Sequence, residues 1–417
     1  MNNGKTVLAK ESRIFDFDRL SGRTFLSDNP ERLSCFGLCS PKIIQKQLKV
    51  WQVTEVTNPS ADRRDFLTGR LAQQIAAEAA LRSADLPTTE VPTRGPVLLL
   101  QTTAMACHFD VILNPDGPAL QVEAASEALD LVHQLEAMMT IYRPEAELAI
   151  INQTAALEPV EVSGELFDLL IEARDLVAKT EGAFDPTTGP LIAVWRTARK
   201  EGRLPSTAEL EAARQLTGMD QIQLDVASKT VRYRQPGVEL NLGAIGKGYA
   251  VDCAGRHLSS RGIDHWLVHG GKSSVLALGD HAGHGGWPVG LRDPLLPQHS
   301  WGTILLKNQA LGTSGTAAQG FRVGGRRYGH ILDPRTGWPV ENVLSVSVLT
   351  ARAALADALS TAFFVLGVEK TRLLCDNSTD VGVLLFTQSS RQTAAEATII
   401  NVPPEILYPA RSPAASF

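Results

Sequence analysis

The chain has 417 residues, of which 44% are hydrophobic and 20% charged, and 40 Lys and Arg face 45 Asp and Glu, a net charge of −5 at pH 7. Such a composition is that of a globular protein able to bury a core, and it excludes disordered and collagen-like chains. The mildly acidic balance gives no broad cationic surface and no run of 18 apolar residues occurs, so neither a nucleic-acid partner nor a membrane-spanning helix is expected.

Residues 1–97 are predicted to form an irregular N-terminal extension that carries one amphipathic helix. Residues 1–60 lack regular apolar spacing, whereas residues 62–84 place apolar side chains on one side of a helix. Arg63 and Arg64 resemble a twin-arginine export motif, but the stretch that follows is short and polar, which favours a helix of a folded protein. Because the first residues contain no apolar h-region, no ordinary signal peptide is expected. The compartment stays open, and a cytoplasmic location is favoured only by the absence of a convincing export signal.

Residues 98–402 are predicted to form one α+β domain, because short strands are mixed with separated helices, and residues 403–417 are predicted to be a tail. Strands are predicted at 97–101, 109–113, 222–225, 230–233, 237–241, 265–269, 274–278, 287–291, 300–306 and 344–349. Helices are predicted at 121–139, 164–180, 207–216, 247–260 and 352–366, with a further helix and strand after the last of these.

Two glycine-containing clusters could bind a ligand. Residues 182–195 form a Gly- and Pro-rich segment after a helix, in which Asp185 either caps a turn or serves a functional loop. In residues 240–252 a predicted strand leads through a Gly-rich turn into a helix that carries Lys247. Free backbone N–H groups and the helix dipole at such a junction suit a phosphate, although the spacing is neither that of a P-loop nor that of a dinucleotide fingerprint.

Two further clusters carry titratable groups. His330 stands beside an Asp-Pro turn, where it is either an acid–base candidate or a histidine satisfied by backbone groups. Asp357 and Thr361 are four residues apart on an apolar helix, so both face one side of it. Together with a carbonyl, water and phosphate oxygens they would suit Mg²⁺; alternatively Asp357 caps or pairs within the fold and Thr361 bonds back to the helix.

These clusters, in this order, resemble the ApbE-type family of FAD:protein FMN transferases. The matching segments are GAFDPTTGPL, LNLGAIGKGYAVD, HGGKSSVLALG, GTSG, GHILDPRTGWPV and ADALSTAFFVLG, and the resemblance spans about residues 98–400. It implies an α+β fold with a T-fold-like core and two lobes around a flavin site. It also implies Mg²⁺-dependent transfer of FMN from FAD to a Thr hydroxyl of an acceptor protein, such as a subunit of an electron-transfer complex, with release of AMP. Members of the family are often exported and membrane-anchored.

The resemblance also implies roles for individual residues. The implied Mg²⁺ ligands are Asp357, Thr361 and the backbone carbonyl of Ala244. The implied flavin contacts are Met105, Tyr142, Ala183, Phe184, Asp185, Asn241, Lys247 and Ile331. His330 would act near the attacking hydroxyl, and His330 or Asp357 would take its proton.

The chain departs from the family pattern at the flavin contacts more than at the metal ligands. Asn241 stands where the family usually has Asp, residues 106–108 are Ala-Cys-His in place of Gly-Thr, and Lys272 replaces an Asn. Two alternatives therefore remain open. One is a metal-dependent FAD pyrophosphatase that yields FMN and AMP, and the other is a non-catalytic flavin-binding protein.

Overall fold

The computed structural model describes residues 6–12, 95–316, 320–376, 378–389 and 395–410. All of them belong to one of the two units into which the chain divides. The helix expected at 62–84 and the last residues of the expected tail lie outside the described part. Within the described part, none of the helices has both the length and the apolar character that a membrane crossing requires.

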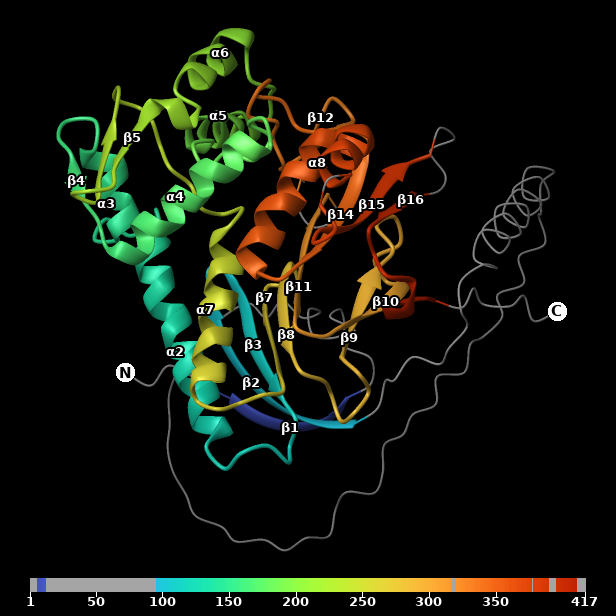
Figure 1. The fold of residues 1–417 in the computed structure, drawn as a ribbon. Helices are drawn as coiled ribbons and strands as arrows, with labels where there is room; N and C mark the ends of the chain where they lie inside the picture. The colour runs from blue at the N-terminus through green and yellow to red at the C-terminus, as the bar shows by residue number, and fades with distance from the viewer. Residues whose placement is uncertain (1–5, 13–94, 317–319, 377, 390–394, 411–417) are drawn as a thin grey trace, which may run out of the picture. The chain divides into compact units, whose positions relative to one another are not determined.

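A nine-stranded antiparallel sheet forms the centre of the fold (Figure 1), in the order β1-β2-β3-β7-β8-β11-β14-β15-β16. Its strands are β1 (Thr6–Ser12), β2 (Gly95–Ala104), β3 (Cys107–Leu113), β7 (Trp266–Gly270), β8 (Ser274–Leu278), β11 (Gln309–Gly315), β14 (Val343–Thr350), β15 (Gly382–Gln388) and β16 (Ala395–Ile400). The prediction of irregular structure over residues 1–60 is wrong for β1, which pairs with β2 along the sheet edge. The sequence of β1, TVLAKES, does not alternate apolar and polar residues, so the pattern that indicates a strand is missing there.

Three helices cover one face of this sheet (Figure 1): α2 (Gln121–Met139), α7 (Gly246–Ser260) and α8 (Ala353–Cys375). Their apolar sides and that face of the sheet form the main core. The helix predicted at 352–366 and the helix expected after it both form: they are the two helical segments of α8, separated by the non-helical residue Gly367 (φ 73°, ψ −175°). That backbone conformation is open to glycine and strained for other residues.

A three-stranded sheet packs on the opposite face. It consists of β9 (Trp287–Arg292), β10 (Ser300–Leu306) and β17 (Leu407–Pro409), in the order β17-β10-β9. The prediction of a tail over 403–417 is wrong for β17, which pairs with β10. A second apolar core fills the space between the two sheets, and Trp287 is fully buried there. The mixture of antiparallel sheets and separated helices confirms the predicted α+β class.

The remaining elements form a smaller region, at the upper left of Figure 1. They are α3 (Glu147–Thr154), β4 (Val160–Glu161), α4 (Gly164–Lys179), α5 (Gly189–Lys200), α6 (Thr207–Gln215), β5 (Ile222–Asp225) and β6 (Thr230–Tyr233), and the hairpin of β12 (Gly320–Val323) and β13 (Arg326–Gly329) packs against α5 and α6. The sequence analysis missed α5, because its start carries Gly and Pro. Proline at the first turn of a helix is favourable, so these residues begin the helix instead of breaking it.

The strand predicted at 237–241 does not form. Val238 and Leu240 are buried as the alternating pattern implies, yet the segment pairs with no strand among the described residues. The side chain of Asn152 takes the place of a neighbouring strand: its Nδ2–H donates to the carbonyl of Leu240 (2.9 Å), and its Oδ1 accepts from the N–H of Leu240 (2.8 Å). The N–H of Asn241 donates to the carbonyl of Pro186 (2.7 Å).

Candidate active site

A cleft of about 690 Å³ lies where the first turn of α7, the first turns of α8 and the ends of the central strands meet. Every site residue predicted from the sequence lines this cleft except Tyr142. The lining residues from that set are Met105, Ala183, Phe184, Asp185, Asn241, Ala244, Lys247, His330, Ile331, Asp357 and Thr361. Segments more than 200 residues apart in sequence are thus brought to one place, which neither spacing nor periodicity could establish.

Tyr142 lies outside the cleft lining. It follows α2, it is 73% exposed, and its hydroxyl accepts a hydrogen bond from Arg196 Nη2 (3.3 Å). The guanidinium of Arg196 also lies over the tyrosine ring, 5.9 Å from its centre. The contact of Tyr142 with a flavin therefore stays a prediction.

Asp357 is the buried acid of the cleft. It is only 4% exposed, and its carboxylate accepts hydrogen bonds from the N–H of Gly248 (2.7 Å) and from the hydroxyl of Ser274 (2.6 Å). Burial raises the pKa of Asp357 to about 6, whereas the charge of Lys247 and the two hydrogen bonds oppose this shift. A carboxylate has about four lone-pair sites, so this one can still bind a cation from the cleft.

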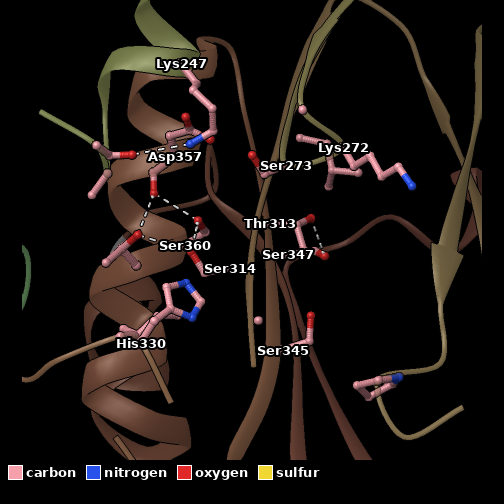
Figure 2. A pocket seen from close by; sticks show the side chains of 18 of the residues that line it. Lys247, Lys272, Ser273, Thr313, Ser314, His330, Ser345, Ser347, Asp357 and Ser360 are labelled. Carbon is pink, nitrogen blue, oxygen red and sulfur yellow. Dashed lines mark hydrogen bonds between the residues drawn. The ribbon is translucent and has the colours of Figure 1, made fainter. Parts of the chain in front are cut away.

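Hydroxyl groups extend the polar surface from Asp357 along α8. The hydroxyl of Ser314, on β11, lies 2.9 Å from that of Ser360 and 3.1 Å from that of Thr361. Thr361 also donates to the backbone carbonyl of Asp357 (3.3 Å), as the structural alternative for this residue anticipated. Figure 2 shows Asp357, Ser360 and Ser314 together beside α8, with Lys247 at one end of the group and His330 farther along the helix.

This donor set fits Mg²⁺ in one particular way. The described ranges hold no group of three or more His, Cys, Asp and Glu that could hold a metal. The set implied by the resemblance is smaller: one carboxylate, one hydroxyl and one backbone carbonyl. Mg²⁺ commonly takes one or two carboxylates together with waters and substrate phosphates. Asp357, Thr361 and Ala244 all face the cleft and match that mode, which needs phosphate oxygens to complete the coordination.

Lys247 supplies the cation of the cleft. It stands in the first turn of α7, whose start at Gly246 carries the positive end of the helix dipole. Its Nζ donates to the carbonyl of Gly243 (3.3 Å), so the ammonium lies over the glycine-rich turn. Asn241 shapes the same turn, since its Oδ1 accepts from the N–H of Gly243 (2.9 Å). The free N–H groups expected here are mostly taken, because those of Gly243, Ile245, Gly246 and Gly248 are bonded to Asn241, Leu242 and Asp357. What the junction offers a phosphate is therefore the charge of Lys247 and the positive end of the helix dipole.

Two tight turns in unusual backbone conformations line the cleft next to Lys247. Met105 (φ 50°) and Ala106 (φ 59°) join β2 to β3, and Gly271 (φ 59°) and Lys272 (φ 65°) join β7 to β8. Residues other than glycine rarely adopt this left-handed region, and such strain is found where the surrounding structure imposes it. Glu136 stabilises the first turn, because its Oε1 accepts from the N–H of Met105 (2.6 Å).

The loop around Asp185 fits both sequence interpretations. Its Oδ1 accepts from the N–H (2.8 Å) and the hydroxyl (2.5 Å) of Thr187, so it caps a turn while it also lines the cleft. Burial raises the pKa of Asp185 against the effect of these bonds. The hydroxyl of Thr187 in turn accepts from the N–H of Gly218 (2.6 Å), which ties the loop to the chain beyond α6.

His330 is placed by a rigid loop. Arg335 and Asp333 form a two-point ion pair (2.8 and 2.9 Å) within it, and the indole N–H of Trp195 donates to the carbonyl of Gly337 (2.7 Å). The imidazole itself is on the exposed side of the cleft. A group in this position can meet a second molecule that enters from solvent.

Sequence reasoning gave no role to Ser274, Ser314, Gly248 or Glu136, which position the predicted residues. Ser274, Ser314 and Gly248 stand inside the motifs that carried the family resemblance, and that position was the available signal. Glu136 is a polar residue of a periodic helix, and nothing in its sequence context distinguishes it from the solvent-exposed residues of α2.

Replacing Asn152 by alanine is expected to loosen the approach to the cleft. The change removes both bonds to Leu240 and leaves the hydroxyl of buried Tyr233 without its acceptor, Asn152 Oδ1 at 2.6 Å. We expect a loss of about 2 kcal/mol in unfolding free energy, measured by denaturant titration. Unchanged stability would show that the 240–241 segment does not depend on this side chain.

The profile of the ApbE family matches residues 105–385 of the chain. The chain is 33% identical over 267 residues to an FAD:protein FMN transferase of Klebsiella pneumoniae, covering 64% of this chain and 82% of the relative. It is 31% identical over 324 residues to one of Vibrio cholerae, covering 76% and 92%. The solved structure of the ApbE protein of Thermotoga maritima aligns with a TM-score of 0.65 at 29% identity, over 72% of this chain and 97% of that one. The Vibrio cholerae flavin transferase ApbE aligns with a TM-score of 0.64 at 29% identity, over 73% and 96%.

Proposed function

The chain belongs to the ApbE family, and we propose that it transfers FMN from FAD to a threonine hydroxyl of an acceptor protein, with Mg²⁺ as metal ion and AMP as leaving product. Curated relatives that it matches over most of their length are named FAD:protein FMN transferase. The acceptor is proposed to be a subunit of an electron-transfer complex.

The observation that carries this proposal is the convergence of Asp357, Lys247 and the Gly-rich start of α7 on one cleft that also holds His330. Transfer requires the acceptor hydroxyl oxygen to attack the phosphorus of the FMN half of FAD. The bond between that phosphorus and the bridging oxygen breaks, and AMP leaves with this oxygen. Negative charge gathers on the phosphoryl oxygens and on AMP, so a cation fixed beside them lowers the barrier.

Different residues would bind the substrate, hold the metal ion and accept the proton. Lys247 would hold the diphosphate by its charge, and the rigid 183–185 loop and the Met105 turn would orient the flavin half. Asp357, Thr361 and the Ala244 carbonyl would hold Mg²⁺, which supplies charge neutralisation of the diphosphate when bound. The attacking hydroxyl gives up a proton, and His330 on the open side of the cleft is the base positioned to accept it.

Replacing His330 by glutamine is expected to slow transfer about 10²-fold, because general-base catalysis contributes 10²- to 10⁴-fold and Gln cannot accept the proton. FAD affinity should stay near that of the unchanged protein, since the glutamine keeps the size of the side chain. Single-turnover kinetics and a flavin-binding titration check the two effects separately. Equal loss of FAD affinity and rate would make His330 a binding residue instead of a base.

The nucleotide products test the reaction class. The protein is incubated with FAD and Mg²⁺, with and without a Thr-containing acceptor, and FMN, AMP and FAD are separated by chromatography. AMP that appears only with the acceptor supports transfer. FMN and AMP released equally without it would establish the pyrophosphatase alternative, and intact FAD in both samples would favour the flavin-binding protein.

A further inference from the structure

Helices α7 and α8 hold each other through an exchange of carboxylates and backbone N–H groups. From α8, Asp357 accepts the N–H of Gly248 on α7 (2.7 Å). From α7, Asp252 accepts the N–H groups of Ala353 (2.7 Å) and Ala354 (3.0 Å) at the start of α8. The two contacts are one helical turn apart on α7, so together they fix both the distance and the register between the helices.

Asp252 acts as an N-terminal cap supplied by another helix. The residue before α8, Arg352, provides no side-chain cap of its own, and the first N–H groups of a helix need acceptors. Asp252 is 4% exposed, and a carboxylate buried to this degree is stable only when it is well bonded. Burial raises the pKa of Asp252 while the two backbone bonds and the nearby arginines oppose that shift.

Gly248 makes this contact close. A Cβ at Gly248 would lie 2.2 Å from the carbonyl oxygen of Ala353, so the two backbones touch without any side chain between them. Arg352 links the start of α8 to α4 as well, because its Nη2 donates to Glu172 of α4 (2.7 Å). Its Nε lies 3.9 Å from Asp252. The start of α8 is therefore held from α7 and from α4.

We propose that Asp252 is a positioning residue for the metal site: by capping α8 it sets where Asp357 and Thr361 would meet a bound Mg²⁺. This inference rests on the proposed function. Asp252 does not line the cleft, so it acts through α8 and not on the substrate. Its loss should shift α8 along its axis against Gly248 and Ser274, and so weaken the metal site before it weakens flavin binding.

The test is the Asp252→Asn variant of the full chain with FAD bound. Asparagine keeps the size of the side chain but offers one acceptor oxygen, and its amide would face an N–H donor. Mg²⁺ itself is the probe, titrated while the thermal midpoint is followed, because an ion that binds only the folded protein stabilises it by RT ln(1 + [Mg²⁺]/Kd). We expect the apparent Kd for Mg²⁺ to rise about 10-fold or more, with FAD affinity in the absence of Mg²⁺ unchanged.

A second readout separates positioning from general stability. The apparent KM for Mg²⁺ in the transfer assay should rise more than kcat falls. His257→Gln on the same helix is the matched control, since it removes the contact of His257 with Glu127 of α2 (2.9 Å) and leaves α8 untouched. Where Asp252→Asn does not fold, Asp252→Glu keeps the charge at a different length and is expected to show the same Mg²⁺ effect.

The outcomes are distinct. A lower melting temperature with an unchanged Mg²⁺ dependence would overturn the inference and leave the proposed function intact. A Mg²⁺ response that is absent in the unchanged protein, or that survives Asp357→Ala, would overturn the proposed metal site and this inference with it. A selective loss of Mg²⁺ affinity in Asp252→Asn, absent from His257→Gln, is the supporting result.

Discussion

Replacing Asp357 by alanine is expected to lower the rate of FMN transfer about 10³-fold, since a bound metal contributes several kcal/mol of charge stabilisation and each 1.36 kcal/mol is tenfold in rate. Asp357 is the buried carboxylate of the cleft, and it holds its place through Gly248 and Ser274. Without it, Thr361 and a backbone carbonyl are the remaining proposed ligands. Initial rates at saturating FAD and acceptor, measured over a range of Mg²⁺ concentrations, check this result.

The fold should survive this change. Alanine leaves the Gly248 N–H and the Ser274 hydroxyl without an acceptor, which lowers the stability of the fold. It also removes a charge that is costly to bury, and this offsets part of the loss. Asp225→Ala is the matched control, because Asp225 lies at an exposed turn between β5 and β6 and accepts backbone N–H groups there in a comparable way. Transfer at the unchanged rate by folded Asp357→Ala would remove this residue from the metal site.

Replacing Gly312 by alanine is expected to destabilise the protein by about 3 kcal/mol, the upper end of the range for overpacking. A Cβ at Gly312 would lie 2.3 Å from the carbonyl carbon of Ala356 and 2.6 Å from the backbone nitrogen of Asp357. The obstacle is backbone, so no side chain can turn aside. Helix α8 would have to lift from β11, which separates Ser314 from Ser360 and Thr361.

Denaturant titration measures the stability loss, and the transfer rate should fall with it because Asp357 moves as well. Gly164→Ala is the control: its Cβ would meet only the end of the Lys229 side chain, which can move away, and alanine favours the helix that starts there. Equal stability of Gly312→Ala and the unchanged protein would mean that α8 can shift on the sheet at little cost.

The sequence predicted the long periodic elements well. The helix predicted at 121–139 has those bounds in the structure. Its apolar residues repeat with helical spacing over the whole segment, and no Gly or Pro interrupts it. Residues 237–241 show a limit of sequence-based prediction. Their alternating pattern predicts correctly which side chains are buried, but a strand also needs a neighbouring strand to bond to. Here the side chain of Asn152 makes those backbone hydrogen bonds instead. Such a contact joins residues 88 positions apart and leaves no local signal.

For the candidate site, too, the sequence predicted some residues and missed others. Residue chemistry indicated Lys247, His330, Asp357 and Thr361 as candidates, and the family resemblance added the flavin contacts, all of which the structure gathers in the cleft except Tyr142. The residues that hold them in place received no role, although Ser274, Ser314 and Asp252 stand inside the motifs that carried the family resemblance. What Asp252 does depends on the crossing of α7 and α8, which only the folded chain defines.

The most direct test of the account is the intact mass of an acceptor protein after incubation with this protein, FAD and Mg²⁺. The proposed reaction predicts a gain of one FMN less one water, located by fragmentation on a threonine, and no gain when that threonine is replaced by valine. FMN and AMP in solution beside an unmodified acceptor would contradict the transferase account and assign the cleft to hydrolysis.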